Sequence, residues 1–193
     1  MSPPSEVQRS SVRYPGGLSA RYRWAGNDVA EQVFALSETG GALSDHGALV
    51  SAEPDRLCRA ELRVEGPVGT WTARFASLVF DEPLGLLWDT PALLVVKYGF
   101  TAYGLASRSG ELRWWHPSGT PILAVLGSPR LPHVLVQSEV ETIALDASGE
   151  VAWRVAHSDV VTGAELMGST LALTSYAGVV SALDPLTGQT LRA

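Results

Sequence analysis

Residues 144–153 read Ala144-Leu145-Asp146-Ala147-Ser148-Gly149-Glu150-Val151-Ala152-Trp153, and two other segments share this pattern. They are Gly104-Leu105-Ala106-Ser107-Arg108-Ser109-Gly110-Glu111-Leu112-Arg113-Trp114 and Ala182-Leu183-Asp184-Pro185-Leu186-Thr187-Gly188-Gln189-Thr190-Leu191-Arg192. The turn glycines Gly110, Gly149 and Gly188 are 39 residues apart in both intervals. Equal spacing of one turn pattern indicates an internal repeat.

Each copy of this pattern predicts a β-hairpin. An apolar strand leads into Asp or Ser, whose side chain can bond the turn backbone, and then into a glycine that supplies a positive φ. The second strand carries Trp114 in one copy and Trp153 in another. We expect both indoles to pack between neighbouring units, because a large aromatic surface stabilises such an interface.

Further short apolar runs, such as Leu93–Val96, Val134–Val136 and Leu171–Leu173, precede each hairpin and read as strands. A period near 40 residues with three or four strands is typical of a β-propeller blade. The chain has room for about four to five antiparallel blades, so an all-β propeller-like stack, possibly incomplete in strands, is predicted. A fainter copy of the turn lies at 35–41. A two-sheet β-sandwich is the alternative architecture.

The three segments resemble the tryptophan-docking repeat of quinoprotein-type (PQQ-like) β-propellers, Ala-x-Asp-x-x-Thr-Gly-Lys-x-x-Trp. The resemblance covers roughly residues 92–193. Segment 182–192 matches its spacing with Arg192 in place of Trp, 104–114 lacks the Ala and Asp, and 144–153 is one residue short. The resemblance implies a fold and no particular activity. Quinone-dependent dehydrogenases with such blades are far longer, so no cofactor is expected.

Composition indicates one folded domain. The chain has 193 residues, of which 46% are hydrophobic, and this favours a packed core. Prolines and glycines between serines predict a flexible N-terminal tail over 1–17, followed by a single propeller-like domain over 18–193. We find no apolar signal region and no membrane-spanning run, so a cytoplasmic protein is expected.

Charge and cysteine content argue against several functions. The net charge is −6, and the arginines are scattered singly along the sequence, so nucleic acid is not an expected partner. No membrane partner is expected either, because no apolar run is long enough to span a bilayer. The single cysteine, Cys58, cannot form an internal disulfide. The histidines His46, His116, His133 and His157 do not occur at metal-ligand spacing, so no metal site is predicted. No nucleophile elbow, phosphate-binding loop or dinucleotide motif is present.

One set of loops remains as a candidate binding face. In a propeller, the turn between the second and third strands of a blade shares a face with the connection to the next blade. The residues expected there are Tyr98, Phe100, Trp115, His116, Glu139, Glu141, His157, Asp159 and Tyr176. Aromatic anchors favour protein interfaces. We therefore predict a non-enzymatic protein-binding or scaffold module with an unidentified protein partner.

The rival interpretation is a small propeller hydrolase that acts on carbohydrate through paired carboxylates. Asp146 and Asp184 are its best candidates, although both fall in repeat turns. The chain is expected to close its ring by pairing Ala20–Trp24 with Thr190–Arg192, or to form a homodimer through unpaired strand edges.

Overall fold

A computed structural model describes residues 6–26 and 58–192 of the chain. The strands in these residues form four separate antiparallel sheets, each a meander in which consecutive strands are neighbours. The first sheet contains β1 (Gln8–Tyr14), β2 (Leu18–Ala25), β3 (Cys58–Gly66) and β4 (Gly69–Ser77), with a short 3₁₀ turn, η1 (Pro15–Gly17), between its first two strands. The all-β prediction is thereby confirmed.

The other sheets follow in chain order. The second contains β5 (Leu84–Trp88), β6 (Leu93–Tyr98), β7 (Thr101–Ala106) and β8 (Leu112–Pro117). The third contains β9 (Ile122–Leu126), β10 (Val134–Ser138), β11 (Glu141–Leu145) and β12 (Val151–Ala156). The fourth contains β13 (Val161–Met167), β14 (Thr170–Ser175) and β15 (Val180–Leu183), and Thr190 adds an isolated bridge to Leu183.

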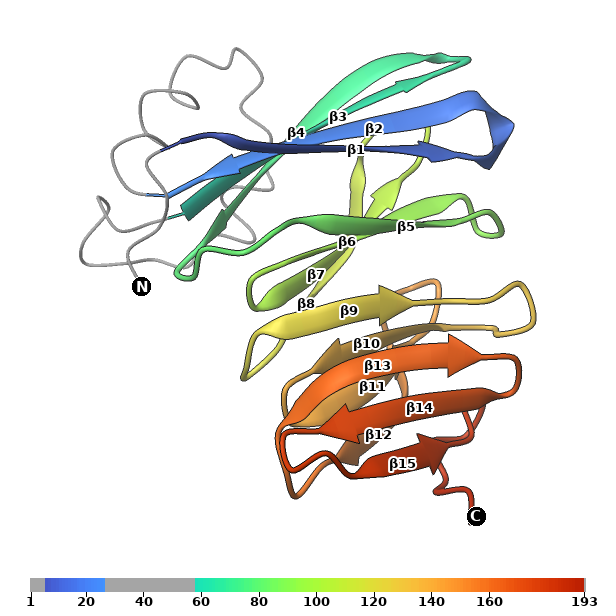
Figure 1. The fold of residues 1–193 in the computed structure, drawn as a ribbon. Coiled ribbons are helices and arrows are strands. Elements are labelled where there is room, and N and C mark those ends of the chain that lie inside the picture. Colours follow the sequence, from blue (N-terminus) through green and yellow to red (C-terminus); the bar gives the residue numbers. More distant parts are fainter. Residues whose placement is uncertain (1–5, 27–57, 193) are drawn as a thin grey trace.

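The four sheets are stacked face to face in the order of the sequence, with the first and fourth at opposite ends (Figure 1). Three hydrophobic cores lie at the three junctions between them. Leu94, Val96 and Tyr98 of β6 belong to the first core, whereas Leu93 and Val95 belong to the second. Because neighbouring residues of a strand point to opposite faces, β6 is apolar on both sides and is buried throughout. This arrangement is that of successive β-propeller blades.

A tryptophan connects each sheet to the next. Trp71, Trp114 and Trp153 are each the third residue of the fourth strand of their sheet. They pack on Gly110, Gly149 and Gly188, which are the turn glycines of the following sheet and have φ values of 73°, 84° and 72°. A Cβ on Gly149 would lie 2.6 Å from Trp114 Cγ, and one on Gly188 would lie 2.6 Å from Trp153 Cε3. Only glycine therefore fits this contact.

The indole N–H groups show where the three junctions differ. Trp71 Nε1 donates to Ser107 O at 3.0 Å, and Trp114 Nε1 donates to Ala147 O at 3.2 Å. At the third junction the ring of His133 takes the corresponding place, since its Nε2 lies 2.7 Å from Pro185 O. Trp153 Nε1 has no hydrogen-bond partner among the described residues, so the third junction lacks one of the polar contacts of the other two.

Three expectations need correction. Residues 8–17 are not a loose tail, because Gln8–Tyr14 forms β1 and pairs with β2 along its whole length. Ala20–Trp24 does not close a ring with Thr190–Arg192, since β2 lies between β1 and β3. The two-sheet sandwich is replaced by four stacked sheets. The fainter repeat copy at 35–41 and His46 lie outside the described residues.

Candidate functional site

The turns expected to share one face do so, and backbone hydrogen bonds fix them to one another. Ser118 N donates to Phe100 O at 2.7 Å, which holds the connection 118–121 against the β6–β7 turn. His157 N donates to Val140 O at 2.8 Å, and Tyr176 N donates to Val160 O at 2.7 Å. The connection 157–160 thus contacts the corresponding turns of both the third and fourth sheets. We call this surface, formed by 78–83, 98–101, 117–121, 138–141, 157–160 and 175–180, the rim.

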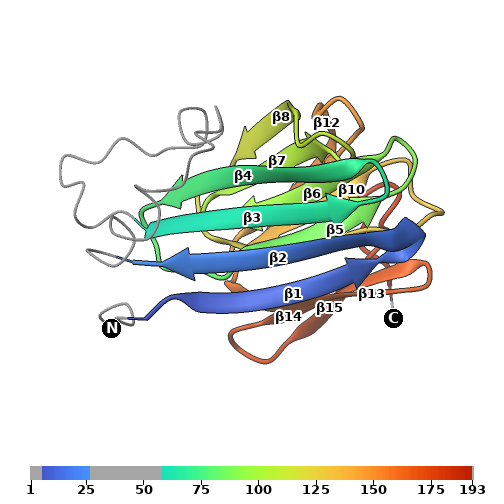
Figure 2. The same ribbon diagram turned by 90° about the horizontal axis from the view of Figure 1, so that it is seen from above.

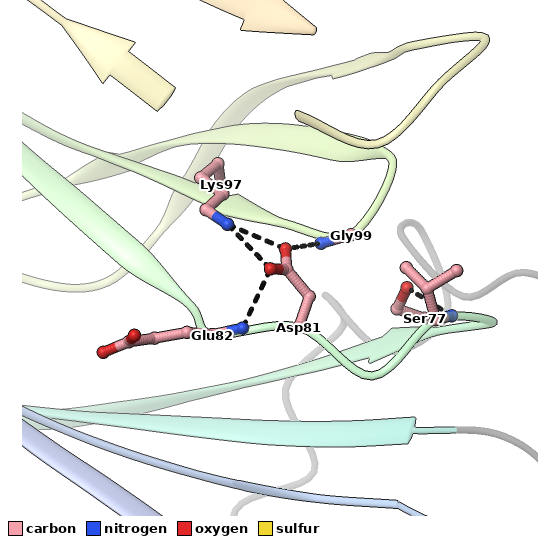
Figure 3. Close-up of polar contacts among 6 residues, drawn as sticks. Ser77, Asp81, Glu82, Lys97 and Gly99 are labelled. Carbon is pink, nitrogen blue, oxygen red and sulfur yellow. Dashed lines mark hydrogen bonds and ion pairs between the residues drawn. The ribbon is translucent and has the colours of Figure 1, made fainter. Parts of the chain in front are cut away.

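The first connection of the rim is held by the only lysine of the chain (Figure 3). Lys97, at the end of β6, has a side chain that is only 5% exposed, and its Nζ lies 2.9 and 2.8 Å from the two carboxylate oxygens of Asp81. Asp81 also accepts a hydrogen bond from Gly99 N at 2.9 Å. One carboxylate therefore fixes the connection 78–83 to both β6 and its following turn. This Lys97–Asp81 ion pair, which we call the clasp, therefore has a structural role.

A polar cluster of His116, Glu141, Arg154 and His157 crosses the junction between the second and third sheets. Arg154 Nε and Glu141 Oε1 form an ion pair at 2.9 Å. His116 belongs to β8 of the second sheet, yet its pKa responds to both of these charges on the third sheet. Glu141 also acts on the pKa of His157. The structure therefore brings together three residues that the sequence predicted for the binding face, and adds Arg154.

The tautomer of His157 follows from its hydrogen-bond chain. Gln137 Nε2 donates to Ser138 O at 2.7 Å and to Glu141 O at 3.1 Å, so its Oε1 must be the accepting atom. Thr142 Oγ1 donates to that oxygen at 2.5 Å. The hydroxyl proton of Thr142 is already used in this hydrogen bond to Gln137. In the 2.7 Å contact between Thr142 Oγ1 and His157 Nε2, the ring nitrogen must therefore be the donor. The neutral imidazole consequently keeps its lone pair on Nδ1.

Burial lowers the pKa of both His116, which lies next to the rim, and His157. For His116, desolvation is the largest cause, the positive charge of Arg154 acts in the same direction, and Glu141 opposes them. For His157, desolvation again lowers the pKa and Glu141 partly offsets it. Both rings are therefore uncharged near neutral pH. They can accept a hydrogen bond from a partner and can gain a charge on acidification.

Asp159 and Tyr176 form the part of the rim on the fourth sheet. Asp159 Oδ1 accepts a hydrogen bond from Val160 N at 2.8 Å, and Oδ2 accepts one from Ala177 N at 3.3 Å. A hydrogen bond with Ser175, followed by these backbone contacts, lowers the pKa of the Asp159 carboxyl. The side chain of Tyr176 is 81% exposed. The Asp159 carboxylate thus fixes the connection 157–160 to the turn that carries the exposed Tyr176.

The other predicted residues are less available to a partner. Tyr98 is fully buried in the first core beside Phe75, and burial raises the pKa of its phenol, so its ring cannot contact a partner. Trp115 is 45% exposed, but it faces the opposite side of β8 from His116 because adjacent strand residues alternate. Phe100 and Glu139 are half-buried in rim turns.

The functional residues that sequence reasoning missed are Lys97, Asp81, Gln137, Thr142 and Arg154. A signal for Lys97 and Gln137 exists, since each is a polar residue that follows a run of apolar residues inside a predicted strand. A buried polar side chain needs a partner and so indicates a specific contact. No signal could identify Asp81, because its partner is distant in the chain and is chosen by the fold.

Asp146 and Asp184, the carboxylates proposed for a hydrolase, accept hydrogen bonds within their own turns. Asp146 Oδ1 accepts hydrogen bonds from Ser148 N at 2.8 Å and Ser148 Oγ at 2.6 Å. Asp184 accepts hydrogen bonds from Leu186 N and Thr187 Oγ1. Among the described residues, no group of three or more His, Cys, Asp or Glu side chains is placed to hold a metal ion. No helix in that part of the chain has the length and apolar character to cross a membrane.

Comparison with known proteins agrees with the architecture. No protein-family model matches the chain, and no curated protein matches its sequence. The crystal structure of BamB from Moraxella catarrhalis is similar, with a TM-score of 0.50, 19% identity, and coverage of 71% of this chain and 48% of that chain. A crystal structure of HIRA has a TM-score of 0.51 and 12% identity, and covers 95% of this chain and 51% of that one.

Dihydro-heme d1 dehydrogenase NirN in complex with DHE is also similar, with a TM-score of 0.51, 15% identity, and coverage of 74% of this chain and 36% of that chain. The chain thus spans about half of these solved chains or less. Likeness at such low identity shows the fold alone. Together with the four stacked meanders, it defines an all-β protein of the β-propeller class.

Proposed function

We propose that the protein is a non-enzymatic protein-binding or scaffold module, and that the rim is its binding surface. The exposed Tyr176, in a turn whose next residue donates a backbone hydrogen bond to the Asp159 carboxylate, is the observation that carries this proposal. Tyrosine is favoured at interface centres because its ring gives contact area with little loss of conformational freedom. The cluster of His116, Glu141, Arg154 and His157 supplies polar contacts around it.

The docked tryptophans support a quinoprotein-type origin for the blades. Each indole covers a turn glycine of the next sheet, and two of the three donate to a turn carbonyl. The contacts rigidify the stack, which favours a scaffold because a preorganised surface loses less entropy on binding. We place the protein in the cytoplasm, since Cys58 is a free thiol buried in the first core.

A pair of variants on the fourth sheet tests the role of the rim. Tyr176→Ser changes an exposed rim residue, and Leu186→Ser changes an exposed residue of the turn at the other end of the same sheet. Partners captured from the source organism are compared between the wild type and both variants. We expect the amount of a specific partner captured by Tyr176→Ser to fall at least tenfold relative to the wild type. Leu186→Ser should capture as much of it as the wild type does. Equal retention by both variants would place the interface away from the rim.

A further inference from the structure

Arginines that are scattered along the sequence gather on one face of the first sheet. Residues paired across neighbouring strands lie on the same face, and the register pairs Arg9 with Arg23 with Glu61 with Arg74. The next row is Ser11, Arg21, Arg63 and Thr72, and a third row is Arg13, Ser19, Glu65 and Thr70. With Arg59, seven of the thirteen arginines occupy this face, against two glutamates.

This face points away from the stack. Ala20, Tyr22 and Trp24 alternate with the arginines of β2 and fill the first core, so the arginines point to the outside. Figure 2 shows the first sheet from this side, with β1 to β4 next to one another and no other described strand in front of them. In a protein with net charge −6, the described residues of this face carry seven arginines and two glutamates, a surplus of about five positive charges among them.

The arrangement is costly for the fold. Arg9 lies opposite Arg23 and Arg21 lies opposite Arg63, and like charges that face each other across strands destabilise a sheet. Glu65 offsets part of this repulsion, since it contacts Arg21 at 3.5 Å and Arg63 at 3.4 Å. Glu61 fixes Arg23 through a contact of 2.8 Å. The acidic side chains thus hold guanidinium groups in place while leaving the face positive.

A hollow of about 560 Å³ lies among these residues, lined by Arg9, Ser10, Ser11, Arg21, Tyr22, Arg23, Glu61 and Arg63. This size falls within the range of about 300–1,000 Å³ that is usual for sites of organic ligands. Guanidinium groups bind phosphate through paired hydrogen bonds. Two phosphate monoesters carry roughly −3 to −4 charges, which is close to the surplus of the face. Ser11, Ser19, Thr70 and Thr72 complete the three rows, and among the described residues no aromatic side chain stands in these rows. Tyr22, which also lines the hollow, belongs to the first core.

We propose that the outer face of β1–β3 binds an organic ligand that carries two phosphate groups. Arg21, Arg63 and Arg9 contact the phosphates, and Arg23 is a positioning residue held by Glu61. Ser11 supplies a hydroxyl beside them. This site lies on a different sheet from the rim and does not depend on the proposed protein-binding role.

Titration with inorganic pyrophosphate at low ionic strength, followed through the arginine side-chain NMR signals, tests the proposal. We expect saturable binding that shifts the signals of Arg21 and Arg63. The double variant Arg21→Gln/Arg63→Gln should weaken binding at least about tenfold, because each arginine supplies charge-assisted hydrogen bonds. The matched control Arg113→Gln/Arg130→Gln changes two exposed arginines outside this face and should bind within about twofold of the wild type. Thermal melting checks that both variants fold.

Several results would overturn the proposal. One is the absence of saturable binding by the wild type, and another is equal weakening in both double variants, which would show a response to net charge alone. A hexaglutamate peptide or a single-stranded oligothymidylate that binds as tightly as pyrophosphate, with the same dependence on Arg21 and Arg63, would indicate a surface for extended polyanions. A bisphosphorylated sugar that binds more tightly than pyrophosphate would support an organic ligand.

Discussion

The first and third sheets have the same number of strands and the same meander, but they are buried in different ways. The third sheet packs on both faces, and β10 is buried throughout. Among the described residues, the first sheet packs against another sheet on one face and carries arginines on the other. The turn at Gly149 in the third sheet receives a tryptophan, whereas the corresponding turn of the first sheet has nothing within 4 Å of a Cβ added to Gly69. The first sheet is therefore built as an end of the stack.

This difference shows how position in a stack determines the sequence of a blade. A sheet covered on both sides needs nearly continuous apolar strands, such as Val134-Leu135-Val136. A sheet covered on one side alternates apolar and polar residues, as in Ala20-Arg21-Tyr22-Arg23-Trp24. At the other end of the stack, Arg192 replaces the tryptophan that would dock on a further unit. Within the described residues, no tryptophan packs on Gly69, and Arg192 stands at the position of the docking tryptophan.

The largest effect is expected at the junction of the second and third sheets. Trp114→Ala should lower the free energy of unfolding by about 3–5 kcal/mol, because a ring that is 7% exposed is removed from a core. Chemical denaturation measures this loss. Trp153 is half-buried and lacks the indole hydrogen bond, so Trp153→Ala should cost less than Trp114→Ala. An equal or larger loss for Trp153→Ala would show that the third junction is as strong as the second.

Removal of the clasp should have the next largest effect. Lys97→Met leaves Asp81 without its cationic partner and should cost about 3 kcal/mol, near the lower end of the range for buried pairs, since Asp81 is 23% exposed. The matched control is Arg113→Met, which breaks an exposed pair with Glu111 and should cost less than about 1 kcal/mol. Denaturation of both variants gives the comparison. Similar losses would mean that the Lys97–Asp81 pair stabilises no more than a surface pair.

Two glycine variants separate the effect of the tryptophan contact at Gly149 from the effect of the positive φ that glycine permits. Gly149→Ala and Gly178→Ala both place a side chain at a positive φ, of 84° and 79°, and each should lose about 1–2 kcal/mol for that reason. Only Gly149 lies against an indole, whereas Gly178 has nothing within 4 Å. We expect Gly149→Ala to cost about 1–3 kcal/mol more. If thermal melting gives the same loss of stability for both variants, Trp114 can move to make room for the added methyl group without a loss of stability.

The smallest effect is the pH dependence of the third sheet. The folded-state pKa of His157 lies below its usual value of 6.5, so the unfolded chain takes up a proton first as the pH falls. Stability is therefore fully present above about pH 6.5 and decreases below it. The melting temperature should fall on acidification, and His157→Gln should reduce the slope of this fall. A slope that the variant leaves unchanged would assign the pH dependence to other groups.

The repeat made much of the fold predictable. Three turns with equal spacing define the hairpins of the last three sheets, and these hairpins occur where the glycines stand. The first sheet was harder to recognise, because its short turn at 66–69 lacks the repeat pattern and Trp71 is 43 residues before Trp114. A strand made mostly of polar residues, as β1 is, also resembles a polar tail when its partner strand is unknown.

For the candidate site, the sequence could predict which turns share a face, since this follows from an up-and-down meander. It could not predict which side chains meet there. Tyr98 and His116 both stand near strand ends, yet the first fills a core, whereas the charges of Glu141 and Arg154 on the next sheet act on the pKa of the second. The alternation of each strand and the stacking of the sheets decide between these outcomes.

The sequence by itself determined the repeat, the turn glycines and the all-β class, because short-range spacing and turn chemistry specify them. Only the tertiary structure decided that seven dispersed arginines form one face, that Lys97 has Asp81 as its partner, and that the two ends of the stack differ. These features join residues that are distant in the chain. Their contacts depend on strand register and on the order of the sheets, which no local pattern encodes.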